Sequence, residues 1–287
     1  MTLLEGLRTS PTSLVAVVAI LGLLVGSFLN VVILRLPRMM EQNWKRDARD
    51  ALDLPAVEEE RLSLSHPPSC CPSCRAPIRP WQNVPVISWL VLRGRCANCH
   101  APISAQYPLV EIASALLSAI CAWHFGYSPA LVAALILSWV LLVLAVIDLR
   151  TQLLPDDLTL PLLWLGLLLA LVPLFADLRS AVIGAIAGYL VLWSVFWLFK
   201  LVTGKEGMGY GDFKLLAALG AWLGWQSLPT IVLLSSVVGA LVGIGLIVFR
   251  RHGREVPIPF GPYLAAAGWL TLVFGTQIQN AYLHAVG

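Results

Sequence analysis

The sequence has 287 residues, of which 58% are hydrophobic and 12% are charged, with a formal net charge of +3. Soluble domains carry about 25% charged residues, so this composition excludes an ordinary soluble domain and indicates a polytopic membrane protein. We expect a membrane-lipid environment and no nucleic-acid partner.

The first predicted element is a transmembrane helix that is kept in the mature protein. Arg8 precedes an apolar run from Leu14 to Leu34, which is long enough to cross a bilayer. No small-residue cleavage site precedes the charged stretch after this run, so a cleavable signal peptide is not expected. On the same helix, Gly22 and Gly26 predict close helix packing, and Asn30 can hydrogen-bond to a partner helix.

Further apolar runs long enough to span a membrane follow along the chain. They predict an all-α membrane protein with about eight transmembrane helices, or seven if the short, glycine-containing sixth run is re-entrant. The eight runs lie at about residues 12–34, 108–125, 129–147, 157–175, 180–199, 211–225, 229–249 and 258–278.

The distribution of lysine and arginine orients these spans. If residues 35–107 are cytoplasmic, 17 Lys and Arg residues fall on the cytoplasmic side and only Arg8 and Arg179 on the other. The positive-inside rule therefore places both termini in the periplasm and turns the ends of the third, fifth and seventh spans to the cytoplasm.

The chain is thus predicted to have three parts: a first helix at 1–34, a cytoplasmic loop at 35–107 and a multi-helix membrane domain at 108–287. Within the loop, residues 39–65 mix charges of both signs and predict a short amphipathic helix or a connector. Residues 66–107 differ, because they are rich in cysteine, proline, arginine and tryptophan.

Four cysteines of this second part have the spacing of a metal site. Cys71 and Cys74 form one C-x-x-C knuckle, and Cys96 and Cys99 form another after 21 intervening residues. Four thiolates predict a structural tetrahedral zinc site, since so small a loop cannot bury enough apolar surface to fold without a metal. A redox dithiol and reduced cysteines without metal are the alternatives.

Other cysteines and histidines are given lesser roles. Cys70 is either a spare thiol or a competing ligand, whereas Cys121 lies in an apolar run and is expected to be a small buried side chain. His66 and His100 flank the knuckles. They are expected to face solvent or to contact the ligand side chains without binding the metal, because four sulfurs complete its coordination shell.

Asp148 ends the third apolar run, where a carboxylate is costly and is a functional candidate. The alternative is a helix-end carboxylate that reaches interfacial water, paired with Arg150. Asp156 and Asp157 follow Pro155 at the start of the next span and are expected to cap that helix and favour its dipole.

Asp212 follows Gly209, Tyr210 and Gly211 at the start of the sixth run. Glycines allow the backbone to bend and to approach other groups closely. Irregular backbone at membrane depth is tolerated where it lines a cavity. The glycines therefore predict a water-filled pocket at Asp212. The alternative is a loop with an N-cap aspartate.

The predicted topology brings Asp148 and Asp212 to the same membrane face, although they are 64 residues apart. Two close carboxylates share one proton, so one can activate water while the other donates to the scissile carbonyl. The sequence therefore predicts aspartyl-protease chemistry. It contains no H-E-x-x-H and no G-x-S-x-G motif, which disfavours zinc and serine proteases.

Six segments in chain order resemble the type IV prepilin peptidase family of GxGD aspartyl membrane proteases. They are Gly26-Ser27-Phe28-Leu29-Asn30, the four-cysteine loop, Tyr107-Pro108-Leu109-Val110-Glu111, Ile147-Asp148 with Leu154-Pro155-Asp156, Gly209-Tyr210-Gly211-Asp212-Phe213-Lys214, and Ile258-Pro259-Phe260-Gly261-Pro262-Tyr263. One departure is Arg150, where many members of the family have an acidic residue.

The resemblance implies an activity and its partners. The enzyme would cut type IV prepilins and type II secretion pseudopilins after a glycine, removing a basic leader at the cytoplasmic face of the bacterial inner membrane. It would then methylate the new N-terminus with S-adenosylmethionine. Glu111 is a candidate for the methyl-donor site, and its alternative is a helix N-terminal acid that satisfies the dipole.

Three other functions remain open from the sequence. They are a zinc-regulated membrane transporter whose carboxylates bind protons or cations, a non-catalytic scaffold of a secretion machine, and a general GxGD protease that cuts inside transmembrane helices.

Overall fold

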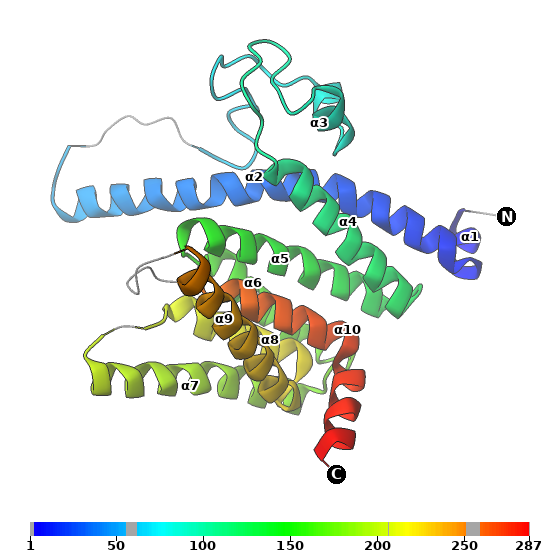
Figure 1. Cartoon of the computed structure of the whole chain (residues 1–287), viewed down its shortest axis with the longest axis vertical. Helices are drawn as coiled ribbons and strands as arrows, with labels where there is room; N and C mark the ends of the chain where they lie inside the picture. The colour runs from blue at the N-terminus through cyan, green and yellow to red at the C-terminus, as the bar shows by residue number, and fades with distance from the viewer. Residues whose placement is uncertain (1–2, 56–61, 206, 251–258, 287) are drawn as a thin grey trace. The chain divides into compact units, whose positions relative to one another are not determined.

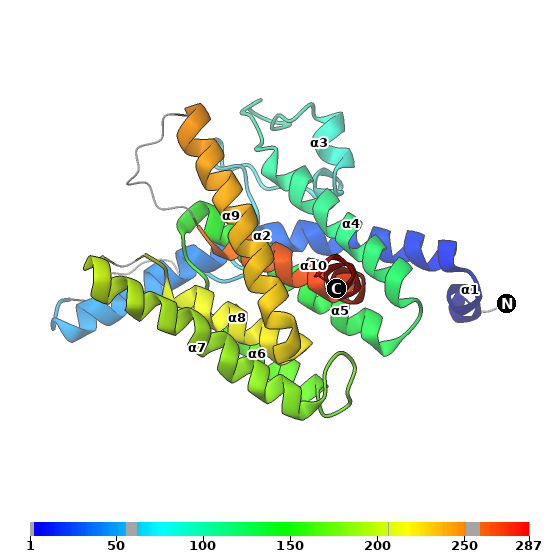
Figure 2. The ribbon, with the colours of Figure 1, turned by 60° about the horizontal axis from the view of Figure 1, so that its bottom comes forward.

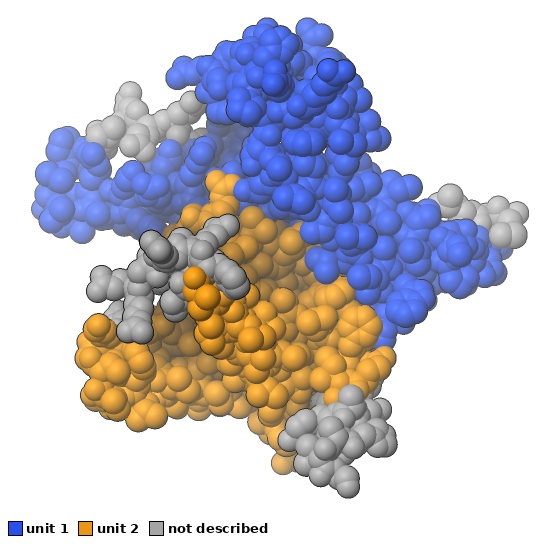
Figure 3. All heavy atoms as spheres, in the orientation of Figure 1, with its two compact units in different colours: residues 1–127 blue, residues 128–287 orange. Residues whose placement is uncertain are grey.

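The computed structural model describes residues 3–55, 62–205, 207–250 and 259–286. Within these ranges the chain consists of α-helices and two short 3₁₀ helices without a strand, which confirms the all-α prediction. The helices belong to two compact units, residues 1–127 and 128–287 (Figure 3). Arg61, Arg251 and Arg254, which contribute to the charge asymmetry, and Ile258 of the last motif lie outside the described residues.

Unit 1 is built around two long helices, α2 and α4 (Figure 1). Ser10 caps α2 by accepting a hydrogen bond from the amide of Ser13, and Pro11 occupies its first turn. Its 41 residues correspond to about 62 Å of helix, about twice the hydrocarbon thickness of a bilayer. The elements of unit 1 are α1 (Leu3–Thr9), α2 (Pro11–Ala51), η1 (Pro80–Asn83), α3 (Ile87–Val91) and α4 (Gln106–Phe125).

Small residues bring α2 and α4 into close contact. A Cβ atom on Gly22 would lie 2.6 Å from Oγ of Ser118, and one on Gly26 would lie 2.7 Å from Cα of Glu111. The side-chain amide of Asn30 donates to the carbonyl of Tyr107 on α4 at 3.0 Å. These contacts confirm the packing predicted for the first helix.

The segment after the first span begins as a direct continuation of its helix. α2 does not end near Leu34 but runs to Ala51, so the first half of the predicted 39–65 connector is helical. Residues 56–61 lie outside the described part of the chain. Beyond them, Arg35 donates to the carbonyls of Ser63 at 2.9 Å and Pro67 at 2.7 Å, which ties the start of the cysteine-rich segment to α2.

Unit 2 contains the remaining helices, several of which begin and end at residues typical of helix caps. Ser128 and Asp177 cap α5 and α7 through their side chains, while Gln152 and Gly204 end these helices in the left-handed conformation. The elements are α5 (Pro129–Thr151), α6 (Asp156–Leu169), α7 (Leu178–Thr203), α8 (Tyr210–Leu223), η2 (Trp225–Ser227), α9 (Leu228–Arg250) and α10 (Gly261–Val286).

α8 is the central helix of unit 2 and packs against α6, α7 and α10 (Figure 2). Its residues from Leu215 to Trp222 are all buried, as expected for a helix that is apolar on every side. A Cβ on Gly184 of α7 would collide with the carbonyl of Gly220, so glycines set the closest approach of these two helices. The indole of Trp222 donates to the carbonyl of Leu162 at 2.8 Å, which fixes α8 to α6.

The structure supports five of the eight predicted spans. Five helices of the described chain are long and apolar enough to cross a membrane, and they fall at the first, second, third, fifth and seventh predicted runs. α6 and α8 have 14 residues each, or about 21 Å, too short to span about 30 Å of hydrocarbon alone. The described apolar part of α10, Gly261–Gly275, is also short.

Candidate functional site

Asp148 lies in the last turn of α5, and the structure buries it. Its side chain is 5% exposed, although it is only four residues from the left-handed Gln152 that ends the helix. Its Oδ2 accepts a hydrogen bond from the backbone N–H of Gly261 at 3.0 Å. The carboxylate is therefore oriented by the main chain of another helix.

Gly261 is the first residue of α10, and its N–H is one of the groups that a helix leaves without a partner in its first turn. A Cβ at this position would lie 2.6 Å from Oδ2 of Asp148 and 3.1 Å from Cδ1 of Leu154. Only glycine therefore fits between the two side chains. The sequence analysis gave Gly261 no role, although Pro262 signals the first turn of a helix.

Asp212 lies in the first turn of α8, whose N-cap is Gly209 and not Asp212. Its side chain is 7% exposed, and its buried Oδ1 has no hydrogen-bond partner among the described residues. A Cβ on Gly211 would lie 2.6 Å from Cβ of Leu154, which confirms that this glycine serves a close approach. The helix can therefore begin against the segment that follows α5.

The two aspartates face a common cavity in unit 2. This cavity has a volume of about 310 Å³ and is bordered by the ends of α5, α8 and α10 and by the loop before α8. The residues that line the cavity are Asp148, Gln152, Leu154, Gly207, Met208, Gly209, Gly211, Asp212, Pro259 and Phe260.

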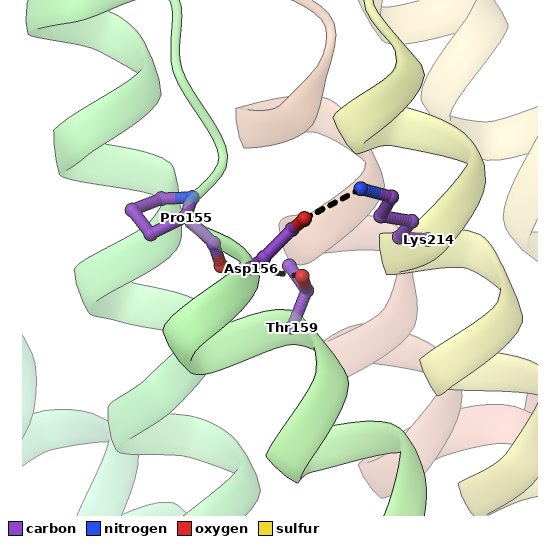
Figure 4. A network of polar contacts seen from close by, with 4 residues as sticks. All are labelled: Pro155, Asp156, Thr159 and Lys214. Atoms are coloured by element: carbon purple, nitrogen blue, oxygen red, sulfur yellow. Dashed lines mark hydrogen bonds and ion pairs between the residues drawn. The ribbon is translucent and has the colours of Figure 1, made fainter. Parts of the chain in front are cut away.

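Asp156 does not cap α6, contrary to the prediction from the sequence. Pro155 is the N-cap residue, and no side chain caps the helix. Instead, Nζ of Lys214 on α8 donates to both carboxylate oxygens of Asp156 at 2.7 Å. Figure 4 shows the two side chains pointing toward one another. Asp157 also lies in the first turn of α6, where both acids favour the helix dipole.

The four predicted cysteine ligands come together in unit 1. Their sulfur atoms all lie within 4.8 Å of one another, and Sγ of Cys71 is 3.8 Å from Sγ of Cys99. Zinc held by four sulfurs at about 2.3 Å in a tetrahedron would space them by about 3.8 Å. The four thiols therefore fit a tetrahedral metal ion.

The two knuckles share one backbone geometry. The amide of Cys71 donates to the carbonyl of Ala76 at 2.9 Å, and that of Cys96 donates to Ala101 at 2.8 Å. Arg75 and His100, each following the second cysteine of its knuckle, both have a positive φ. The sequence analysis missed this repeat, whose signal is the pattern C-x-x-C-x-A-P-I at 71–78 and 96–103.

The surroundings of the cluster favour the thiolate at Cys74 and Cys96, whereas hydrogen bonds with the neighbouring thiols raise the pKa of Cys99 to about 11. The side-chain amide of Asn98 donates to Sγ of Cys74 at 3.5 Å. This hydrogen bond, followed by the backbone at Ala76, lowers the pKa of Cys74 to about 6, and metal ligands must be deprotonated.

The other cysteines and histidines lie as predicted. His66, His100 and Cys70 are exposed and are not part of the cluster, which contains only the four predicted ligands within the described chain. Cys121 is fully buried in α4, as expected for a small apolar side chain.

Glu111 lies in the second turn of α4 and is 6% exposed. Its Oε2 accepts a hydrogen bond from the backbone N–H of Val86 at 2.7 Å. Val86 has a φ of +60°, a conformation that β-branched residues rarely adopt. The carboxylate of Glu111 therefore holds the loop before α3 against α4.

Two protein-family models cover most of the chain. The bacterial peptidase A24 N-terminal domain matches residues 20–125. The type IV leader peptidase family matches residues 135–244, which include Asp148 and Asp212. No solved structure matches the chain.

Full-length relatives carry one name. The prepilin leader peptidase/N-methyltransferase of Pseudomonas aeruginosa is 57% identical over all of this chain and 99% of its own length. Those of Stutzerimonas stutzeri and Aeromonas hydrophila are also 57% identical, over 99% and 98% of both chains. The chain is therefore an enzyme that belongs to the family of prepilin leader peptidases/N-methyltransferases, as the six motifs led us to expect.

Proposed function

We propose that the chain removes the leader of type IV prepilins after a glycine, with Asp148 and Asp212 as its catalytic pair. The observation that carries this proposal is that two buried carboxylates from helices far apart in the sequence line one cavity of about 310 Å³. A close carboxylate pair can share one proton. It can then activate water without an acyl-enzyme.

The contacts of the two carboxylates suggest different roles. Asp148 accepts the N–H of Gly261 at Oδ2, which leaves its other oxygen to take a proton from water. Asp212 has no donor at Oδ1 within the described chain, so it is the better group to carry a proton and give it to the scissile carbonyl. The water oxygen adds to the carbonyl carbon and gives a tetrahedral gem-diol. The peptide C–N bond then breaks as the new amine takes up the proton held by Asp148, and a gem-diol hydroxyl returns a proton to Asp212 as the carboxyl product forms.

The proposed substrates are type IV prepilins and the pseudopilins of type II secretion, cut at the cytoplasmic face of the bacterial inner membrane. The excess of Lys and Arg on one side of the predicted topology supports this orientation. A basic leader is attracted to a cavity that holds at least one carboxylate. We assign peptide cleavage to the part of the predicted 108–287 domain that lies in unit 2, and residues 1–34 and 35–107 to the first span and the cytoplasmic loop.

We further propose methylation of the new N-terminus with S-adenosylmethionine, as the name of the relatives suggests. The methyl donor is a sulfonium cation, so a buried carboxylate is a suitable partner. Glu111 remains our candidate in unit 1, with Oε2 engaged by Val86. The methyl donor supplies an electrophilic methyl group, and the residues of the chain hold the amine that receives it.

Zinc is proposed as the ion held by Cys71, Cys74, Cys96 and Cys99, with a structural role because four sulfurs leave no open position. We expect Cys71→Ser or a strong chelator to unfold residues 66–105, because metal binding replaces a core that this segment lacks. Zinc content and limited proteolysis of the membrane-embedded enzyme measure this. The control is Cys70→Ser, which lies outside the cluster and should keep one zinc and the wild-type digestion pattern. A protease-resistant Cys71→Ser enzyme would contradict the structural role.

The substrate proposal is tested with the purified enzyme, a prepilin and S-adenosylmethionine, followed by intact mass measurement of the product. We expect a product that has lost its leader and gained one methyl group, and an unmethylated product without S-adenosylmethionine. Replacing the substrate glycine before the cut by valine should prevent cleavage. Equal cleavage of this substrate, or cuts within the hydrophobic helix, would instead indicate a general intramembrane protease.

A further inference from the structure

α3 presents an apolar face that its own unit does not bury. Ile87, Leu90 and Val91 are 61%, 61% and 72% exposed, and their i, i+3, i+4 spacing puts them on one side of the helix. The opposite side is packed inward, since the hydroxyl of Ser88 donates to the carbonyl of Trp81 at 2.7 Å. Clustered large apolar side chains at a surface mark an interaction site.

The position of α3 relative to α4 indicates what this face meets. The N–H of Val86, the residue before α3, is bonded to Glu111, which lies five residues beyond the start of α4 at Gln106. Five residues correspond to about 7.5 Å along a helix. Because α4 is long and apolar enough to span a membrane, the start of α3 is held at the level of the membrane surface and not out in the cytoplasm.

The charge around α3 matches an anionic surface. Residues 62–110 contain four arginines (Arg75, Arg79, Arg93 and Arg95) and no acidic residue. The acid nearest to α3 along α4, Glu111, is buried at 6% exposure and bonded to Val86. Four thiolates with one zinc ion would contribute −2, which leaves the segment positive. Arg93 and Arg95 directly follow α3 and line a cavity of about 550 Å³ together with Val91 and His100.

We propose that α3 is an interfacial anchor, with its apolar face in the headgroup region of the membrane and with Arg93 and Arg95 binding the phosphate of an anionic phospholipid. Apolar burial combined with attraction to anionic lipid is the usual basis of interfacial helix binding. The proposal depends on the membrane location of α4 and not on the two aspartates.

The test uses the full-length enzyme in nanodiscs of phosphatidylcholine, or of equal amounts of phosphatidylcholine and phosphatidylglycerol. Amide hydrogen exchange of residues 84–95 is followed by mass spectrometry. We expect exchange to be about tenfold slower with phosphatidylglycerol, and inorganic phosphate added to phosphatidylcholine nanodiscs to have no such effect. Leu90→Ser with Val91→Ser should speed exchange in both lipids.

Matched variants separate this site from general charge. Arg93→Gln with Arg95→Gln should abolish the lipid dependence, whereas Arg75→Gln with Arg79→Gln removes the same charge from the other knuckle and should preserve it. Zinc content shows that each variant keeps its folded cluster. If both pairs of variants lost the lipid dependence of exchange equally, the arginine site would be overturned. Equal protection in detergent and in nanodiscs would show that protein covers α3, and would overturn the anchor.

Discussion

Asp212→Asn and Asp148→Asn are each expected to lower the rate of leader removal by at least about 10³-fold, the scale of general acid–base catalysis. Asparagine keeps the size of the side chain but can neither accept a proton from water nor donate one as an acid. Both side chains are buried at one cavity, so bulk water cannot take over the acid–base role of either carboxyl group. Cleavage of a prepilin by enzyme of equal zinc content measures the effect.

The control is Asp157→Asn, because Asp157 is an exposed acid in the first turn of α6. It should retain the wild-type rate. The double variant Asp148→Asn/Asp212→Asn should be no slower than either single variant, since residues that act as a unit are not additive. Normal cleavage by either single variant would show that this residue is not catalytic, whatever the substrate.

The shared membrane face of the two aspartates could be predicted from the sequence, because it depends on membrane topology. The distribution of Lys and Arg along the chain is a one-dimensional signal, and it predicted that Asp148 and Asp212 share a membrane face. In the structure both line one cavity within unit 2. The four-cysteine cluster was predictable for a similar reason, since C-x-x-C spacing is local.

The lengths of the helices were less predictable, because hydropathy alone does not fix where an apolar helix begins and ends, and α6 and α8 have only 14 residues each. Residues Leu215 to Trp222 of α8 are apolar and are all buried within unit 2, where α8 packs against α6, α7 and α10. Partnerships between distant residues were not predictable either. Asp156 looked like a helix cap, but its partner Lys214 is 58 residues away, and Gly261 is 113 residues from Asp148.

Gly261→Ala is expected to lower kcat for cleavage by about 10²-fold, the cost of a misplacement of about 1 Å at a reacting group. The added Cβ would lie 2.6 Å from Oδ2 of Asp148, closer than non-bonded atoms approach. Either the carboxylate or the start of α10 must therefore move, and the hydrogen bond that orients Asp148 is lost. KM should stay near the wild-type value, because the change affects a catalytic group and not the bulk of the cavity.

Gly275→Ala is the matched control on the same helix. Among the described residues, a Cβ there meets only Cγ2 of Thr271 at 3.5 Å, an ordinary contact, and alanine favours the helix over glycine. This variant should keep its kcat and its thermal stability. A Gly261→Ala enzyme with normal kcat would show that the Gly261 amide does not position Asp148, while leaving the two-aspartate proposal intact. A loss of folded protein without a change in the kcat of the remaining enzyme would assign Gly261 to packing alone. The value of kcat, calculated per folded and zinc-loaded enzyme molecule, therefore decides between the two roles.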